Sequence, residues 1–289
     1  MPFFLSAVFF LSAIFAVFAP VPLFLLYFRS KLRFFHLANF SNLLIIFFAS
    51  GAISAVVYFI FVNILTYGLC YFIFKRGYKP DKASVLTLLL MIATVSIGTF
   101  GFGWSKNVSV WNEVKTSVSK NVEKFIEVSG PEFSRQFGDI PDEKIPEMVI
   151  QELPAVFFIF SLLMIWANLV MIFRVNPVGI MMCTGADPSY LRTWKTPEWL
   201  IWPVIISGAL LIFGKDIYMV IGQNGIKIFL IIYGLQGLSI LSYVLNRFKV
   251  KPLIKTIFYV MIAFFITPLL IAVGFFDLWF DFRAKLRQS

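Results

Sequence analysis

The chain has 289 residues, of which 60% are hydrophobic and 14% are charged, with a formal net charge of +10. Soluble domains contain about 45–50% apolar and roughly 25% charged residues, so this composition excludes an ordinary soluble protein. The Lys and Arg residues gather in short loops between apolar runs, which indicates contact with anionic lipid headgroups and argues against a nucleic-acid partner.

Apolar runs of about 20 residues, long enough to cross ~30 Å of hydrocarbon, recur along the chain. They predict an all-α fold, a polytopic transmembrane helical bundle of about 8 segments, some short or broken by proline. The expected organisation is an N-terminal transmembrane half over residues 1–103, an extramembrane amphipathic helical insert over 104–152, and a C-terminal transmembrane half over 153–289.

The first apolar run, residues 3–19, is expected to be the first span. Pro20 and Pro22 follow, and proline removes a backbone donor and clashes with the preceding turn, so we expect a break or a sharp kink there. The piece over 22–28 is too short to span alone and is either the end of a kinked span or a half-helix. The freed carbonyls need partners from neighbouring helices or a water-lined cavity.

The second apolar run, residues 43–74, is longer than one straight span requires. The small residues from Ser50 to Ser54 offer a place to break it. Basic loops flank the run on both sides, so it either crosses twice or dips in and returns, and we expect two short, tilted segments.

Residues 84–103 form a clean predicted span, after which the composition becomes polar. An apolar stripe at helical spacing predicts a helix ended by Gly130-Pro131, and a second short helix over about 142–152 follows Pro141. The stripe is expected to pack on the bundle's outer surface, or alternatively to dock a partner or the membrane surface. Its residues are Val108, Trp111, Val114, Val118, Val122 and Phe125.

A span led in by Pro154 is expected over 154–173. The last spans are expected over about 198–213, 225–245 and 256–276. With the acidic insert outside, simple alternation places the basic C-terminal tail outside too, against the positive-inside bias. Either one segment is miscounted, or the last run, which has Pro268 in its middle, does not cross fully.

Catalytic chemistry has little support in this sequence. No charged residue or histidine lies near the middle of a confident span, where such groups are usually functional. The sequence has no G-x-S-x-G, H-E-x-x-H, P-loop or GxGxxG motif. Two isolated cysteines, Cys70 and Cys183, and one histidine, His36, make neither a disulfide framework nor a metal site. We therefore expect no enzyme activity, no metal and no cofactor.

Neutral polar residues are the remaining candidates inside the bundle. Small residues and an amide between Gly234 and Ser239 lie on nearly one helix face, which is typical of helix–helix contacts. The alternative is a neutral polar cavity that binds a small solute and is lined by broken segments. The candidate ligand-binding residues are Pro20, Pro22, Asn63, Asn168, Gln236 and Ser239.

Residues 191–203 crowd three tryptophans and two prolines around charges. Thr196 is expected to cap a helix, with Pro197 at its first position and Glu198 favouring its dipole. Arg192 and Lys195 fit cytoplasmic headgroups, or a cytoplasmic partner. The stretch is therefore expected to anchor the start of a transmembrane helix through an aromatic belt, with Trp194, Trp199 and Trp202.

Two carboxylates close the last span, Asp277 and Asp281, with Arg283 just beyond. The first interpretation is an aromatic-belt anchor with flanking charges. The alternative is a fixed ion pair to a basic loop.

The motif Leu191-Arg-Thr-Trp-Lys-Thr-Pro197, followed by Trp202, resembles the entry to a late span in the YybS-like family of bacterial multi-spanning membrane proteins, a domain of unknown function. The ending from Gly274 to Arg283, the Pro20-x-Pro22 break and the charged insert are also similar. The resemblance implies an inner-membrane location. It also implies a distant similarity to the substrate-binding subunits of energy-coupling-factor transporters and to MreD-type proteins.

Two functions compete at this stage. The first is small-solute binding or uptake, which needs a partner for energy because the chain has no nucleotide site. The second is a non-transporting scaffold that docks cell-envelope or division partners through residues 104–152. The expected partners are thus the lipid bilayer, a membrane or cytoplasmic protein, and a small-molecule ligand.

Overall fold

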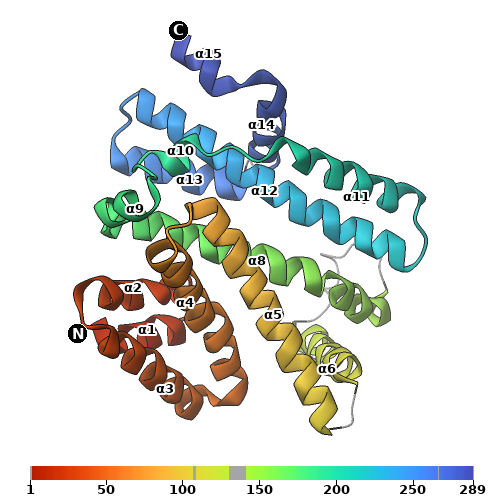
Figure 1. Cartoon of the computed structure of the whole chain (residues 1–289). Coiled ribbons are helices and arrows are strands. Elements are labelled where there is room, and N and C mark those ends of the chain that lie inside the picture. The colour runs from red at the N-terminus through yellow and green to blue at the C-terminus, as the bar shows by residue number, and fades with distance from the viewer. Residues whose placement is uncertain (1, 107–108, 130–140, 266, 289) are drawn as a thin grey trace. The chain divides into compact units, whose positions relative to one another are not determined.

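The computed structural model describes residues 2–106, 109–129, 141–265 and 267–288 (Figure 1). Within these ranges all regular structure is helical, which confirms the all-α fold. Contacts divide the chain into two compact units, unit 1 over Met1–Ala186 and unit 2 over Asp187–Ser289. The three-part organisation expected from composition stays a prediction.

Unit 1 begins with two short helices instead of one span. Helix α1 (Pro2–Leu11) ends early, Ala13 adopts a left-handed φ of 54°, and α2 (Pro20–Arg29) packs back against α1 after a 3₁₀ turn, η1 (Ala16–Phe18). The expected span over 3–19 is therefore wrong. A ten-residue helix is about 15 Å long, half of the hydrocarbon thickness.

The two prolines start a helix and do not kink one. Pro20 and Pro22 occupy the first turn of α2, where backbone donors have no intrahelical partner to lose. The chain reverses before them, at Ser12 to Phe15, where four apolar or small residues gave no sign of a break. Of the two alternatives for residues 22–28, the end of a kinked span or a half-helix, α2 confirms the half-helix.

The second long run folds back on itself at Gly51, as the small residues predicted. Helix α3 (Leu32–Tyr58) holds Gly51 at φ 84° and ψ 178°, a conformation that L side chains rarely adopt. Residues on either side then pair across the hairpin: His36 Nδ1 lies 2.7 Å from the Tyr67 hydroxyl, and Asn63 Nδ2 lies 3.5 Å from the Asn39 carbonyl. The returning arm contains π-helical turns and ends at Lys75, and its elements are η2 (Phe59–Ile64), α4 (Leu65–Leu69) and η3 (Cys70–Lys75).

Helix α5 (Pro80–Lys106) confirms the predicted span, and α6 (Val110–Ser129) confirms the amphipathic helix. Val108 and the expected stop at Gly130-Pro131 lie outside the described residues. The separate helix over 142–152 is wrong, because η4 (Asp142–Lys144) leads into one continuous helix, α8 (Ile145–Val175).

Pro154 was expected to lead into a new span. It lies instead inside α8. Membrane helices tolerate such prolines because neighbouring groups can satisfy the freed carbonyl. With 31 residues, α8 is about 46 Å long and exceeds the hydrocarbon thickness.

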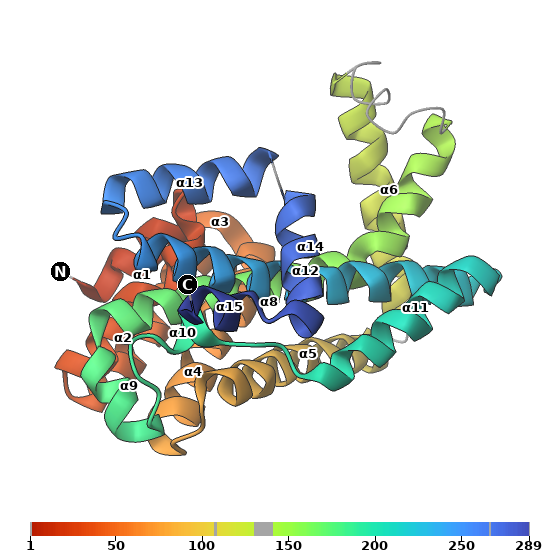
Figure 2. The ribbon, with the colours of Figure 1, turned by 90° about the horizontal axis from the view of Figure 1, so that it is seen from above.

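Helix α6 packs against α8 (Figure 2). Val114, Val118 and Val122 of the stripe are half-buried, whereas Trp111 is 49% exposed. Unit 1 ends with α9 (Pro177–Thr184), capped by the Asn176 side chain.

Unit 2 is built around a long helix, α12 (Ile217–Arg247), which starts before the expected Gly225. Helix α11 (Ile201–Phe213) runs antiparallel to it after a short 3₁₀ turn, η5 (Glu198–Leu200), and a one-turn helix, α10 (Tyr190–Thr193). The run expected as one span over 256–276 is two helices. They are α13 (Pro252–Phe265) and α14 (Thr267–Phe280), followed by α15 (Phe282–Gln288).

Glycines bring the helices of unit 2 into close contact. A Cβ at Gly237 would collide with the Leu270 carbonyl, and a Cβ at Gly274 would collide with the Tyr233 carbonyl, so α12 and α14 touch backbone to backbone. A Cβ at Gly222 would lie 2.7 Å from the Ser207 carbonyl oxygen of α11. The expectation of helix–helix contacts around Gly234 to Ser239 is confirmed.

The distribution of apolar groups fits a membrane protein. Phe48 is 80% exposed, Ile97 72% and Phe213 82%. Among the described residues, four helical stretches are long and apolar enough to cross a bilayer, and three shorter apolar helices accompany them. The long stretches are Leu32–Lys75, Pro80–Lys106, Asp142–Val175 and Ile217–Arg247.

Candidate functional site

A buried ion pair joins the end of α14 to the start of α15 in unit 2. Arg283 Nη2 donates to Asp277 Oδ2 across 2.7 Å, and the two side chains are 2% and 0% exposed. Asp281, at φ 38°, turns the chain between them, and the Phe282 amide donates to Asp277 Oδ1 at 2.8 Å. A buried carboxylate requires such compensation, because burying an unpaired charge is very costly.

Gln236 of α12 extends this pair towards the loop before α11. Its Nε2 donates to Asp277 Oδ2 at 2.9 Å, and its Oε1 accepts from the Thr196 amide at 3.0 Å and from the Thr196 hydroxyl. The expectation that Thr196 caps a helix is therefore wrong. Pro197 itself stands at the N-cap position of η5, not at the first helical position, and no side chain caps that turn.

Backbone carbonyls of the same loop complete the network. Arg283 Nη1 donates to the Trp194 carbonyl at 2.8 Å and contacts Ser239 Oγ at 3.2 Å. Ser239 donates to the carbonyls of Arg192 and Trp194 at 2.9 and 3.2 Å. Thus Arg192 takes part through its backbone. We call the side chains of Thr196, Gln236, Ser239, Asp277 and Arg283 the latch network.

An exposed ion pair lies beside the latch network. Lys195 Nζ is 2.6 Å from Asp281 Oδ2, with both side chains nearly half exposed. The hydrogen bond from Lys195 lowers the pKa of the Asp281 carboxyl. The alternative interpretation, an ion pair to a basic loop, is confirmed for Asp281, and the aromatic-belt anchor stays a prediction. Trp199 and Trp202 are 62% and 64% exposed, and their aromatic-belt role stays a prediction.

The latch network also shows where the C-terminal tail around Arg283 lies within unit 2. Since α11 and α12 form an antiparallel hairpin, the loop at Arg192 and the C-terminal part of α12 lie at one end of it. Arg283 is tied to that loop. The chain after α12 therefore leaves this end and returns to it, which favours the alternative that the last run does not cross fully.

Unit 1 holds a second polar cluster, around the break between α1 and α2. Asn168 of α8 donates through Nδ2 to the Val17 carbonyl at 3.1 Å and to the Met164 carbonyl at 2.9 Å. Val17 lies just before α2, so the neighbouring helix satisfies a carbonyl freed by the break, as expected. Pro20 and Pro22 are buried at the same place.

Three buried amide oxygens in unit 1 lack a hydrogen-bond donor in the described part of the chain. The amide oxygens of Asn39, Asn63 and Asn168 are inaccessible and have no hydrogen-bond donor among the described residues. Asn63 makes one long bond, from Nδ2 to the Asn39 carbonyl at 3.5 Å. Because buried polar groups are nearly always paired, these acceptors point to an additional donor such as a water or a ligand.

The candidate ligand residues thus fall into two sets. Four belong to unit 1: Pro20, Pro22, Asn63 and Asn168. Gln236 and Ser239 belong to unit 2, where they join residues singled out separately as a terminal motif. Whether the two sets share one cavity stays a prediction. Thr196 was missed as a partner of Gln236 because no local pattern marks a contact across 40 positions.

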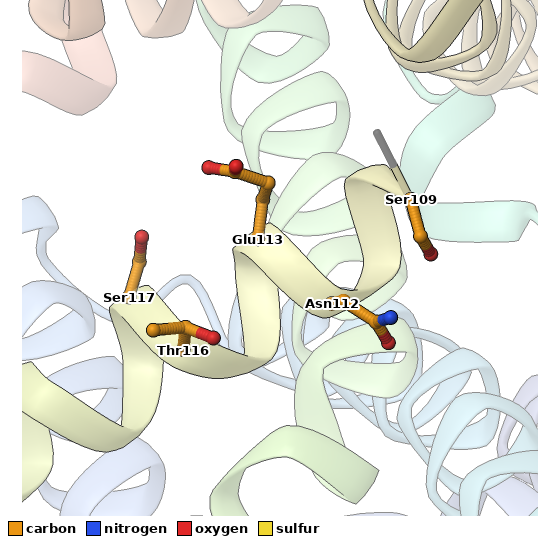
Figure 3. Close-up of a pocket in the computed structure, with 5 residues that line it drawn as sticks. All are labelled: Ser109, Asn112, Glu113, Thr116 and Ser117. Atoms are coloured by element: carbon orange, nitrogen blue, oxygen red, sulfur yellow. The ribbon is translucent and has the colours of Figure 1, made fainter. Parts of the chain in front are cut away.

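A shallow pocket lies on the polar face of α6, with a volume of about 340 Å³. Figure 3 shows the lining side chains, which come from α6 and from Ser109 just before it: Ser109, Asn112, Glu113, Thr116 and Ser117. One helix with one carboxylate provides neither the enclosure nor the convergent groups of a ligand site. No group of three potential metal-ligating side chains was found among the described residues.

A family model described as "predicted membrane protein (DUF2232)" matches residues 3–278. No curated protein and no solved structure matches the chain.

Proposed function

Because the chain belongs to the DUF2232 family of predicted membrane proteins, we propose that it is a small-solute-binding subunit of the bacterial inner membrane. It carries out no chemical reaction and receives energy for uptake from a partner protein. The YybS-like resemblance, through its expected similarity to energy-coupling-factor binding subunits, favours the same assignment.

The observation that carries this proposal is the set of buried acceptors in unit 1. An unpaired buried acceptor costs about 1–3 kcal/mol, and three such groups are a large penalty for a marginally stable fold. A solute that supplies N–H or O–H donors would remove this penalty. Asn39, Asn63 and Asn168 would then orient the solute inside the bundle.

The broken N-terminal helix supports the proposal independently. Transporters commonly place substrate sites at discontinuous membrane helices, whose unwound backbone lines a cavity. The break between α1 and α2 is such a discontinuity, and Asn168 contacts it directly.

The test is retention of a small molecule by the purified chain. Native mass spectrometry of the full chain in mild detergent is expected to release a bound solute from the wild type. Asn63→Leu is expected to lose it while the protein stays monodisperse, since Asn63 contributes only one long hydrogen bond. Asn121→Leu, at an exposed amide on α6, is the control. Wild-type protein that carries only lipid and detergent, or a solute retained equally by Asn63→Leu, would overturn the proposal.

A second candidate function is a scaffold that docks envelope or division partners through α6. It is favoured by exposed apolar groups on this polar helix, with Trp111 at 49% and Val128 at 79% exposure. Trp111→Ser with Val128→Ser is expected to abolish cross-linking to a partner in cells without changing membrane insertion. An unchanged cross-linking pattern would count against the scaffold.

A further inference from the structure

The segment between α12 and α14 carries a concentration of positive charge that its surroundings in sequence do not balance. Arg247, Lys249, Lys251 and Lys255 occupy nine positions, and no acidic residue lies anywhere between Asp216 and Asp277. We call residues 247–255 the basic segment. Such a cluster beside a membrane helix attracts anionic lipids, with a contribution from each cation.

The turn that presents these cations is ordered. Lys249 has a left-handed φ of 50°, and its amide donates to the Asn246 carbonyl at 3.0 Å. The Val250 amide donates to the Leu245 carbonyl at 3.1 Å. Lys255 Nζ reaches back to Asn246 Oδ1 at 3.3 Å, so the end of the basic segment contacts the residue just before its start. The ordered turn thus leads directly into the first residues of α13, where Lys255 lies.

Helix α13, which follows, is too short to cross a bilayer. Its 14 residues are about 21 Å long, against ~30 Å of hydrocarbon. In Figure 2, α14 turns away from α13 at a steep angle, so the two short helices do not make one straight span. An interfacial position therefore suits α13 better than a transmembrane one.

The exposed face of α13 is apolar. Its large exposed side chains recur at spacings of three and four and so share one side of the helix. Lys255 and Tyr259, on the other side, are partly covered. An outward apolar face next to a cationic turn matches the layered chemistry of a leaflet, acyl chains beneath phosphates. The exposed residues are Leu253, Ile254, Ile257, Phe258 and Met261.

The position of Lys251 and Lys255 points to an external anion. They lie at the N-terminal end of α13, where the helix dipole disfavours cations. Phe248, in the same turn, is 67% exposed. A layer of anionic headgroups against the turn would offset the unfavourable dipole and bury Phe248 at the same time.

We propose that the basic segment and α13 form an interfacial element that lies on the cytoplasmic leaflet and binds anionic phospholipid headgroups. Lys249, Lys251 and Lys255 contact the phosphates, and the apolar face of α13 enters the upper acyl region. The cytoplasmic side follows from the positive-inside bias. The element is independent of the solute site proposed for unit 1.

Lipid retention tests the headgroup contact. The full chain is equilibrated in detergent with equal amounts of phosphatidylglycerol and phosphatidylcholine, and bound lipid is measured by native mass spectrometry. The wild type is expected to prefer phosphatidylglycerol, and Lys249→Gln/Lys251→Gln/Lys255→Gln is expected to weaken that binding by about a hundredfold. Lys115→Gln/Lys120→Gln/Lys124→Gln, on α6, removes the same charge and is expected to bind as the wild type does.

Spin labels test the position of α13 separately. Cysteines replace Leu253, Ile257 or Met261, one at a time, in a chain with Cys70→Ala and Cys183→Ser, in phosphatidylglycerol-containing nanodiscs. An interfacial helix gives one shallow depth for all three labels. A depth that increases steadily along the helix would overturn the proposal. Equal lipid loss in both triple variants, no preference for phosphatidylglycerol, or full competition by inorganic phosphate would overturn it too.

Discussion

Arg283 and Asp277 form a solvent-excluded ion pair, 2.7 Å from Nη2 to Oδ2, across the turn between the last two helices. Through Gln236 and the Trp194 carbonyl, this pair fastens the C-terminal tail to the loop before α11. The Arg283 guanidinium thus contacts three parts of unit 2: the loop before α11, helix α12 and the end of α14.

Removing one partner of this pair should be strongly destabilising. Arg283→Ala leaves the Asp277 carboxylate buried without a cation, which typically costs about 3–5 kcal/mol. We expect a large fall in the thermal midpoint of the detergent-solubilised protein, measured by fluorescence-detected size exclusion. Lys285→Ala, at an exposed position of the same helix, is the control and should change little.

The combined variant Asp277→Leu/Arg283→Leu should be milder than Arg283→Ala alone, since it leaves no unpaired charge. If Arg283→Ala unfolds at the same temperature as the wild type, the ion pair does not hold unit 2 together.

The contact between Thr196 and Gln236 should be energetically coupled. Thr196→Val removes the hydroxyl donor and is expected to cost about 1–2 kcal/mol, as is Gln236→Leu. Because both changes remove the same hydrogen bond, the double variant should lose less than the sum of the two. Thermal midpoints of the four proteins measure this. Thr193→Val, at an exposed threonine at the end of α10, is the control. Strict additivity would show that Thr196 and Gln236 do not interact.

The glycine contact between α12 and α14 should not tolerate a methyl group. Gly274→Ala places a Cβ against the Tyr233 carbonyl, so the helices must separate, and the variant should be destabilised. At Gly208 the nearest atom to an added Cβ is Ile226 Cδ1 at 3.9 Å, so Gly208→Ala should be neutral or stabilising through helix propensity. Equal midpoints for both variants would contradict the close crossing.

The Lys195–Asp281 pair should give a small dependence of stability on pH. The Lys195 hydrogen bond lowers the Asp281 pKa below its ordinary value of 3.8, so its stabilisation is complete above that value and disappears as pH falls through the lowered pKa. Both groups are nearly half exposed, so the effect should stay below about 1 kcal/mol and weaken in salt.

Asp281→Asn should remove this part of the acid dependence. The measurement compares thermal midpoints of the variant and the wild type from neutral pH down to the acid range. A larger loss of stability with acid in Asp281→Asn than in the wild type would contradict the assignment.

Local chemistry predicted several elements well. The hairpin at Gly51 followed from small residues inside a run too long for one span, and α6 followed from its stripe. The break after Leu11 escaped prediction, because an unbroken apolar run conceals a turn that tertiary contacts stabilise. Pro154 was wrongly expected to begin a span, because a proline suggests a helix boundary. Inside a membrane helix, neighbouring groups can satisfy the carbonyl that a proline frees, so the helix continues.

The candidate sites show the same limit. The residue types were recognisable: an amide and a serine on one face of α12, and two acids with an arginine at the end. The sequence did not show that these residues meet in space. Gln236 contacts Asp277 across 41 positions, and nothing local encodes that contact. Only packing of α12 against α14 brings these groups together.

An experimental structure of the full chain in lipid nanodiscs tests the proposed solute site most directly. The account predicts non-protein density within hydrogen-bond distance of Asn63 Oδ1 or Asn168 Oδ1, and loss of that density in Asn63→Leu. Amide oxygens that are packed tightly against side chains or paired with protein donors, with no density beside them, would contradict it.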